Sequence, residues 1–201
     1  MRRGAKPAVT APSLTTLSLT TPPGPGPADV AGVLLAPGAG GTRDDATLVA
    51  LEAALAPLPV RRVDLPRSTP AAVAAVGRHA ADLAAELGTP TDRLVVGGRS
   101  FGGRMCSMAV AEGLPVAGLV LLSYPLHPPG HPERPRVAHL PDIGVPVLAV
   151  SGERDPFGSP DELAAALGTV CGPVRLVLVP GAHAPAPAPV VAAVLAWLGR
   201  P

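Results

Sequence analysis

The sequence predicts an α/β fold, with a mostly parallel central sheet of about six to seven strands, helices on both faces and no lid domain. The first observation behind this prediction is that short apolar runs alternate with longer helical patterns along the chain. The second is that these runs are nearly continuously apolar, as strands buried on both faces of a parallel sheet are. The third is that the notable polar residues follow predicted strands, where such sheets bind ligands.

The N-terminal part of the chain leads into the first buried strand. Residues 1–12 are predicted to be a flexible tail, and residues 13–201 a single domain. Residues 14–21 alternate leucine with threonine and serine, which favours an edge strand, and a Pro/Gly turn is predicted over 22–27. Residues 30–36 are almost entirely apolar and predict a buried strand.

Two helices separated by a short strand are predicted next. Thr42 or Asp44 can cap a helix that ends near Leu55, because short polar side chains accept hydrogen bonds from the first helical N–H groups. A strand is predicted over 60–65. The segment 68–88 starts with Ser-Thr-Pro, continues with apolar residues at helical spacing and ends in glycine, which predicts a helix over its length.

The second half of the chain repeats this alternation. Strands are predicted over 94–97, 116–123, 145–150 and 174–179. Helices are predicted over 101–111, 159–167 and 190–198. The segment 124–142 is rich in proline and histidine and is expected to be irregular.

Composition excludes several classes of function. The chain has 16 Lys and Arg against 15 Asp and Glu, so no strong field attracts nucleic acid or an anionic membrane surface. Aromatic residues make up 2% of the chain, which disfavours a base-stacking platform. No run is long and apolar enough for a membrane helix, and no signal peptide is predicted. We expect a cytoplasmic protein with no nucleic-acid or membrane partner, and the composition leaves the oligomeric state open.

The two cysteines indicate neither a disulfide framework nor a zinc site. Cys106 and Cys171 are too few for the former, and no C-x-x-C or Cys/His cluster suggests the latter. Cys106 falls in the predicted helix 101–111 and is expected to be a small core residue. No metal and no cofactor is predicted.

One serine stands between glycines just after the strand predicted over 94–97. Gly98-Arg99-Ser100-Phe101-Gly102 fits G-x-S-x-G, in which a serine is exposed at a sharp strand-to-helix turn. Side chains two residues before or after the serine would collide with the neighbouring strand and helix, so glycine is needed at both places. The pattern predicts Ser100 as a nucleophile, although the pentapeptide alone also fits an ordinary glycine turn.

A candidate acid and a candidate base follow Ser100 along the chain. A serine hydroxyl needs a base to take its proton, and the base needs a carboxylate to orient it. Asp155 and His183 each come just after a predicted strand. Glu153 is the alternative acid, and His183 also fits a surface-loop histidine.

At these residues the chain resembles the α/β-hydrolase superfamily. It is most similar to the small, lidless branch related to dienelactone hydrolases and to the hydrolase-like domains of testis-expressed protein 30 and the KAT8 regulatory subunit. The matching pieces are Leu35–Gly41, Gly97–Arg104, Ser123–His127, Ser151–Phe157 and Gly181–His183. The resemblance implies a serine hydrolase for an ester, thioester or similar acyl bond, with Ser100 as nucleophile, Asp155 as acid and His183 as base. It also implies an oxyanion hole made by the backbone N–H groups of Phe101 and Ala39.

The chain departs from this resemblance at two places. Pro37 stands where relatives often have a histidine, and His183 is followed by a proline-rich segment, 184–189. These departures support an alternative hypothesis, a catalytically inactive protein of the same fold that binds or scaffolds. Acyl transfer to an acceptor other than water is a further alternative, because the same three residues serve both reactions.

The expected partner is a small-molecule acyl substrate. Gly40, Tyr124 and His127 are predicted to bind it, because the loop after the first buried strand and the segment 124–142 border the expected site. An open, lidless site with an apolar, proline-rich border favours a small or moderately apolar acyl group.

Two features near the serine have more than one interpretation. Arg99 and Arg104 can form structural salt bridges or meet an anionic group on the substrate. The glycines of 38–41 can form a phosphate loop before a helix, but Arg43 occupies the place of the final glycine of G-x-G-x-x-G and there is no Walker lysine.

Overall fold

A seven-stranded sheet forms the centre of the computed structural model, which describes residues 14–18 and 26–200. Its strands are β1 (Thr15–Ser18), β2 (Gly32–Ala36), β3 (Val60–Arg62), β4 (Leu94–Arg99), β5 (Gly118–Leu122), β6 (Val147–Gly152) and β7 (Val174–Val179). Their order across the sheet is β1-β7-β6-β5-β4-β2-β3. β1 pairs antiparallel with β7 at one edge, and the other strands run parallel. The predicted α/β class is confirmed, and the predicted edge strand is confirmed over Thr15–Ser18, whereas residues 19–21 lie outside the described residues.

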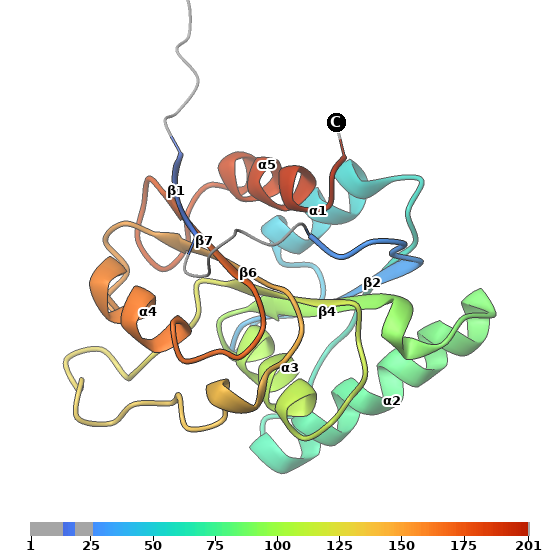
Figure 1. Ribbon diagram of the computed structural model, residues 1–201, viewed down its shortest axis with the longest axis horizontal. Coiled ribbons are helices and arrows are strands. Elements are labelled where there is room, and N and C mark those ends of the chain that lie inside the picture. The colour runs from blue at the N-terminus through green and yellow to red at the C-terminus, as the bar shows by residue number, and fades with distance from the viewer. Residues whose placement is uncertain (1–13, 19–25, 201) are drawn as a thin grey trace, which may run out of the picture.

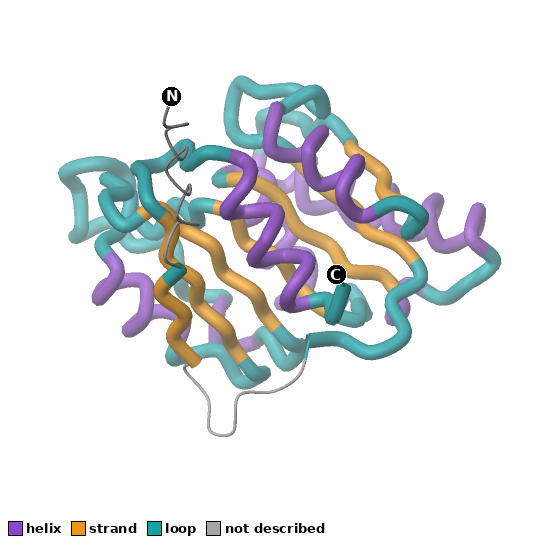
Figure 2. Tube along the Cα trace, turned by 90° about the horizontal axis from the view of Figure 1, so that it is seen from above, coloured by secondary structure: helices purple, strands orange, loops and turns teal. Residues whose placement is uncertain are grey.

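Helices cover both faces of this sheet (Figures 1 and 2). α1 (Ala46–Leu55) and α5 (Pro187–Trp197) contact each other on one face. α2 (Thr69–Leu87), α3 (Phe101–Ala111) and α4 (Pro160–Leu167) pack on the other. Within residues 14–18 and 26–200, no separate lid is evident (Figure 1).

Two apolar cores result, because successive side chains of a strand point to opposite faces. In β2, Val33 and Leu35 pack with α1 and α5, whereas Leu34 and Ala36 pack with α2 and α3. β2, β5 and β6 are buried along their whole length. This explains their nearly continuous apolar sequence, since both faces of each strand are covered.

Two helices begin at residues other than the predicted ones. Asp45, and not Thr42 or Asp44, caps α1: its carboxylate accepts from the N–H groups of the second and third helical residues, at 2.9 Å and 3.4 Å. α5 begins at Pro187, earlier than the predicted residue 190. Prolines are accommodated there because the first helical turn does not use its N–H groups within the helix.

Other helix limits agree with the predicted signals. Gly88 ends α2 with a φ of 61°, in the left-handed region that glycine adopts without strain. Ser159 and Glu162 form a reciprocal capping box at the start of α4. These two helices therefore hold their flanking loops in defined positions.

Some sequence predictions lie outside or between the described elements. The predicted tail, 1–12, and most of the predicted turn, 22–27, lie outside the described residues. The irregular segment 124–142 contains one 3₁₀ turn, Leu140–Asp142. Among the residues described, no helix has the length and apolar character needed to cross a membrane.

Candidate active site

Three strand ends bring the predicted reactive residues together. Ser100 follows β4, Asp155 lies beyond β6, and His183 lies beyond β7. Because these strands are parallel, their carboxyl ends share one edge of the sheet. Ser100 Oγ lies 2.8 Å from His183 Nε2, and His183 Nδ1 lies 3.0 Å and 2.9 Å from the two carboxylate oxygens of Asp155.

The contacts of the imidazole define its proton positions. A carboxylate can only accept, so Nδ1 of His183 carries a proton and donates it to Asp155. In the neutral ring Nε2 is then an acceptor, and the Ser100 hydroxyl donates to it. The Asp155 side chain is only 1% exposed. The line of groups can therefore move a proton from the serine to the imidazole and stabilise the resulting positive charge.

Ser100 occupies a strained turn that the neighbouring strands enforce. Its φ of 48° and ψ of −113° are unusual for a residue with a side chain, and its N–H donates to the Leu122 carbonyl at 2.7 Å. A Cβ on Gly98 would lie 2.1 Å from the Ala36 carbonyl oxygen, and one on Gly102 would lie 2.4 Å from the same atom. The two glycines thus allow the main chain of the turn to pack against the main chain at the end of β2.

The acid is held from several sides. Asp155 accepts a hydrogen bond from the Phe157 N–H at 2.9 Å and one from the Ser151 hydroxyl at 3.4 Å. Glu153, the alternative acid, is exposed, whereas the hydrogen bonds of His183 Nδ1 go to Asp155. Of the two candidate acids, Asp155 is therefore the one that the structure brings to the imidazole.

The loop that carries His183 packs closely against the end of β6. The imidazole stacks on the Phe157 ring, with ring centroids 4.0 Å apart and an angle of 30° between the planes. A Cβ on Gly152 would lie 2.1 Å from the Ala182 carbonyl oxygen, so glycine permits this close approach. The proline-rich residues that follow belong partly to the first turn of α5, and they leave His183 in place.

Arg99 connects the serine turn to two other parts of the site. Its Nη2 donates to the His183 carbonyl at 3.2 Å, and its Nη1 lies 3.4 Å from a carboxylate oxygen of Asp45. Asp45 in turn caps α1. Of the two interpretations of Arg99, the structure supports the structural salt bridge, and the hydrogen bond from Nη2 joins Arg99 to the backbone of the histidine loop.

A tight turn follows β2 and borders the serine. The Gly41 N–H donates to the Gly38 carbonyl at 3.0 Å, and Gly40 has a φ of 75°, which matches a type II turn with glycine at its third position. A Cβ on Gly38 would lie 3.5 Å from Cβ of Ser100, so the turn touches the nucleophile position.

The two predicted oxyanion donors lie at the same cavity. Phe101 and Ala39 both line the cavity that contains Ser100. Pro37 is buried, and its carbonyl oxygen lies 2.5 Å from the place that a Cβ on Gly102 would occupy. The backbone of this loop is therefore held by main-chain packing, without a histidine side chain at position 37.

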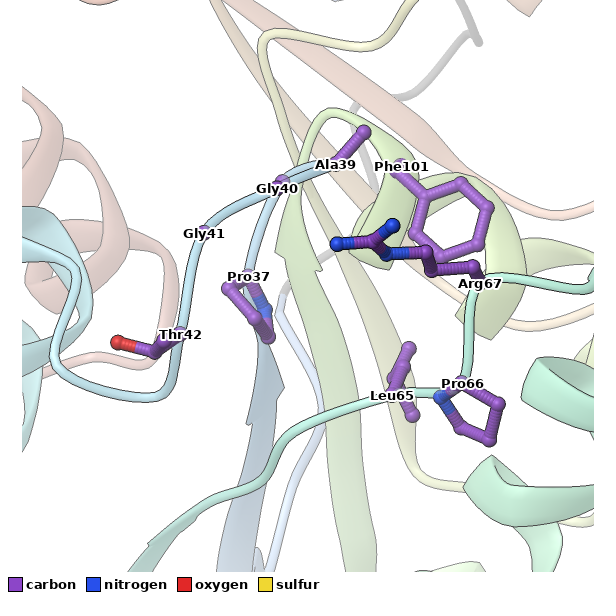
Figure 3. Close-up of a pocket in the computed structure, with 10 residues that line it drawn as sticks. Pro37, Ala39, Gly40, Gly41, Thr42, Leu65, Pro66, Arg67 and Phe101 are labelled. Atoms are coloured by element: carbon purple, nitrogen blue, oxygen red, sulfur yellow. The ribbon is translucent and has the colours of Figure 1, made fainter.

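Two cavities meet at Phe101. One, of about 610 Å³, is lined by Gly38, Ala39, Thr69, Arg99, Ser100, Phe101, Arg104, Pro125, Arg136, Phe157 and His183. The other, of about 580 Å³, shares Gly38, Ala39 and Phe101 with it. Figure 3 shows this second cavity, with Gly40 on the loop after β2 and residues 65–67 on the segment after β3. A substrate at Ser100 therefore has room on both sides of the predicted oxyanion donors.

Tyr124 and His127, both predicted to bind substrate, are not among the described residues that line these cavities. Tyr124 is 2% exposed and its hydroxyl donates to the Arg136 carbonyl at 2.7 Å, while burial raises its pKa to about 12. His127 is also buried, with Nδ1 2.8 Å from the Pro128 carbonyl oxygen. The same segment instead supplies Pro125 and the Arg136 side chain to the cavity, and no local sequence pattern identifies these two.

Other reactive groups lie away from the cavity. Cys106 is buried, its Sγ lies 3.3 Å from the Gly97 carbonyl oxygen, and burial raises its pKa to about 12, so the predicted core position is confirmed. Cys171 is exposed. In the part of the chain that the structure describes, no group of three His, Cys, Asp or Glu side chains is placed to hold a metal ion.

Comparisons with known proteins agree with this architecture. A family model described as an alpha/beta hydrolase domain matches residues 29–185. The structure of TT1662 from Thermus thermophilus is 19% identical, with a TM-score of 0.65 over 87% of this chain and 92% of that one. A carboxylesterase from Mesorhizobium loti is 21% identical, with a TM-score of 0.65 over 88% and 99% of the two chains. The Bacillus cereus carboxylesterase is 15% identical, with a TM-score of 0.65 over 92% and 93%. At these identities the likeness is one of fold, and no curated protein matches the chain.

Proposed function

The chain belongs to the alpha/beta hydrolase family, and from this premise we propose that it is a serine hydrolase that cleaves an ester, thioester or similar acyl bond. The observation that carries the proposal is the 2.8 Å contact between Ser100 Oγ and His183 Nε2, with Asp155 bonded to the other ring nitrogen. The carboxylesterases among the similar structures support the same class of reaction.

The proposed first half-reaction forms an acyl-enzyme. Ser100 Oγ attacks the substrate carbonyl carbon while its proton passes to His183 Nε2. Asp155 keeps the imidazole in the required tautomer and stabilises its positive charge. When the tetrahedral intermediate collapses, His183 gives the proton to the leaving oxygen or sulfur, and the acyl group remains esterified to Ser100.

The second half-reaction returns the enzyme to its starting state. Water attacks the acyl-serine carbonyl and gives a proton to His183 Nε2, and the imidazole then returns that proton to Ser100 Oγ as the acid product leaves. If another hydroxyl or amine took the place of water, the product would be a transferred acyl group. Analysis of the products formed with and without such acceptors separates the two reactions.

Two backbone N–H groups are proposed to stabilise the oxyanion, those of Phe101 and Ala39. Phe101 is the first residue of α3, so its N–H has no acceptor within the helix, and the positive end of the helix dipole adds to its effect. Among the described residues, neither N–H donates to another group. Donors fixed in this way favour the transition state because they need no reorganisation as charge develops.

The alternative of an inactive binding or scaffold protein predicts that His183 lies far from Ser100. The observed contact between the two side chains does not support it. For location, the cytoplasm is the proposal that fits the exposed free thiol of Cys171, because exposed thiols persist in reducing compartments.

Labelling with a fluorophosphonate probe tests the proposal. The wild type is expected to react at Ser100, and Ser100→Ala is expected to lose the label. Ser68→Ala is the matched control, because Ser68 is exposed and makes no side-chain cap bond. A panel of 4-nitrophenyl esters of increasing chain length then measures turnover. A wild type that is folded by circular dichroism yet takes no label and hydrolyses no ester would contradict the proposal.

A further inference from the structure

The cavity beside Ser100 contains two arginines without a carboxylate partner. Arg99, Arg104 and Arg136 all line this cavity. Arg99 pairs with Asp45. Within the described ranges 14–18 and 26–200, no carboxylate forms an ion pair with Arg104 or Arg136. Arg104 and Arg136 are called the arginine pair below.

The backbone of each member of the arginine pair is firmly held. Arg104 lies one helical turn after the nucleophile, and its N–H donates to the Ser100 carbonyl at 3.0 Å. The Arg136 N–H donates to the Leu126 carbonyl at 2.8 Å, and its carbonyl accepts the Tyr124 hydroxyl. Two segments that are distant in sequence thus each place an arginine at the same cavity.

One buried nitrogen atom of the arginine pair has no hydrogen-bond partner among the described residues. Arg104 Nε is buried and has no hydrogen-bond acceptor among the described residues. A buried donor left in this state costs free energy, and an N–H of a charged group costs more than a neutral one. Within the described part of the chain Arg104 therefore has no internal acceptor at Nε, and an anion beside its guanidinium group would compensate part of this cost.

The charges around the pair also favour an anion. The pKa of Arg136 is lowered, first by burial and then by the positive charges of Arg104 and Arg134. Burial and then Arg104 likewise lower the pKa of His139, which keeps that ring neutral at pH 7. Arginine stays protonated in proteins, so the repulsion between the two guanidinium groups must be tolerated or neutralised.

We propose that the arginine pair binds an anionic oxygen group, carboxylate or phosphate, carried by the acyl portion of the substrate. The substrate class is therefore an ester or thioester of a diacid or of a phosphorylated acid. This inference rests on the proposed serine hydrolase activity for its catalytic part. Guanidinium groups suit such a ligand because their planar N–H donors match two oxygens at once.

The second cavity suggests where the rest of the substrate lies. Its lining includes the apolar residues Pro37, Leu65, Pro66 and Phe101, together with Arg67 (Figure 3). The shared residues, Gly38, Ala39 and Phe101, lie between the two cavities. A scissile carbonyl at that border would direct the anionic acyl arm to the arginine pair and an apolar leaving group to the second cavity.

Paired substrates test the anionic preference. The esters 4-nitrophenyl hydrogen succinate and 4-nitrophenyl 4-methylpentanoate share a leaving group and have acyl arms of similar shape, but only the first is charged. The wild type is expected to favour the succinate ester at least tenfold in kcat/KM, because only its carboxylate can form charge-assisted hydrogen bonds with the arginine pair. Arg104→Met and Arg136→Met are each expected to reduce this ratio tenfold or more. Arg78→Met is the matched control, because Arg78 is exposed on α2 and lines neither cavity, and it should keep the ratio.

A binding measurement separates this inference from the proposed catalysis. In Ser100→Ala, titration calorimetry with glutarate and with inorganic phosphate measures anion binding without any reaction, and the preferred anion distinguishes carboxylate from phosphate. Binding that is lost in Arg104→Met or Arg136→Met, with folding verified by circular dichroism, supports the inference even if no ester is turned over. No binding of either anion, or equal kcat/KM for the two esters, overturns it and leaves the serine hydrolase proposal standing.

Discussion

Replacing Asp155 with asparagine removes one charge while nearly preserving the shape of the side chain. In the structure one carboxylate oxygen accepts from the Phe157 N–H at 2.9 Å, so the amide oxygen of the introduced asparagine must keep that position. The amide NH₂ then replaces the other oxygen, which lies 2.9 Å from His183 Nδ1. The Nδ1–H keeps only the amide oxygen, 3.0 Å away, as an acceptor, while the NH₂ group favours an Nδ1 that accepts. The tautomer that carries the imidazole proton on Nε2 is therefore stabilised.

The size of the effect follows from this change of tautomer. With its proton on Nε2, the imidazole can only donate to Ser100 Oγ, so it no longer acts as the base. The charge that stabilised the imidazolium is lost as well. We expect kcat to fall about 10⁴-fold, as asparagine does in other triads, which is about 5 kcal/mol of transition-state stabilisation. KM should change little, because Asp155 is buried behind His183 and does not line the substrate cavities.

Steady-state hydrolysis of a 4-nitrophenyl ester measures the fall in kcat. The rate of fluorophosphonate labelling gives a second, independent measure of the reactivity of Ser100. Glu153→Gln is the matched control, since it removes the same charge from the exposed alternative acid in the same turn. The control is expected to stay within twofold of the wild type. A folded Asp155→Asn enzyme that retained a tenth of its kcat, or a Glu153→Gln enzyme that lost as much as Asp155→Asn, would refute the reasoning.

The remaining predictions concern the support of the site and the stability of the fold. Arg99→Gln removes the ion pair and weakens the bond to the His183 carbonyl, so kcat/KM should fall about tenfold, and an unchanged value would deny Arg99 a positioning role. Gly77→Ala in α2 should raise the free energy of unfolding by about 1 kcal/mol, because a Cβ at position 77 meets no atom within 4 Å; a lower Tm on thermal melting would count against this. A thiol reagent at pH 8 should titrate one cysteine per native chain and two after denaturation, since the pKa of Cys106 is raised to about 12 and Cys171 is exposed. Two thiols reacting at once in the native protein would contradict the burial of Cys106.

The sheet could be predicted from the sequence because its signals are local. Continuous apolar runs mark strands that are covered on both faces, and α3 begins and ends at the predicted residues. Ser100, Asp155 and His183 can be predicted as candidate site residues in a similar way, since each follows such a run. The choice of Asp45 as the cap of α1 could not be predicted, because three neighbouring polar residues can all cap and only the exact start of the helix decides.

The walls of the cavities could not be predicted because they depend on contacts between distant segments. Tyr124 was expected to face substrate, but its hydroxyl finds its acceptor at Arg136, twelve residues further along an irregular segment. The path of that segment also brings Arg136 to the cavity beside Ser100. Proline and histidine content indicated an irregular segment there, but irregular backbone has no period from which the direction of a side chain can be inferred.

The contact between the serine turn and the Ala36 carbonyl has a consequence for how this chain tolerates sequence change. Main-chain atoms on both sides make that contact, so substitutions in the two cores can alter side-chain volume without altering the spacing between nucleophile and oxyanion donors. Insertion or deletion of one residue in β2 has the opposite effect, because it moves the carbonyl against which the turn is aligned. We therefore expect substitutions in the two cores to preserve the geometry of the site, and insertions or deletions in β2 to disrupt it.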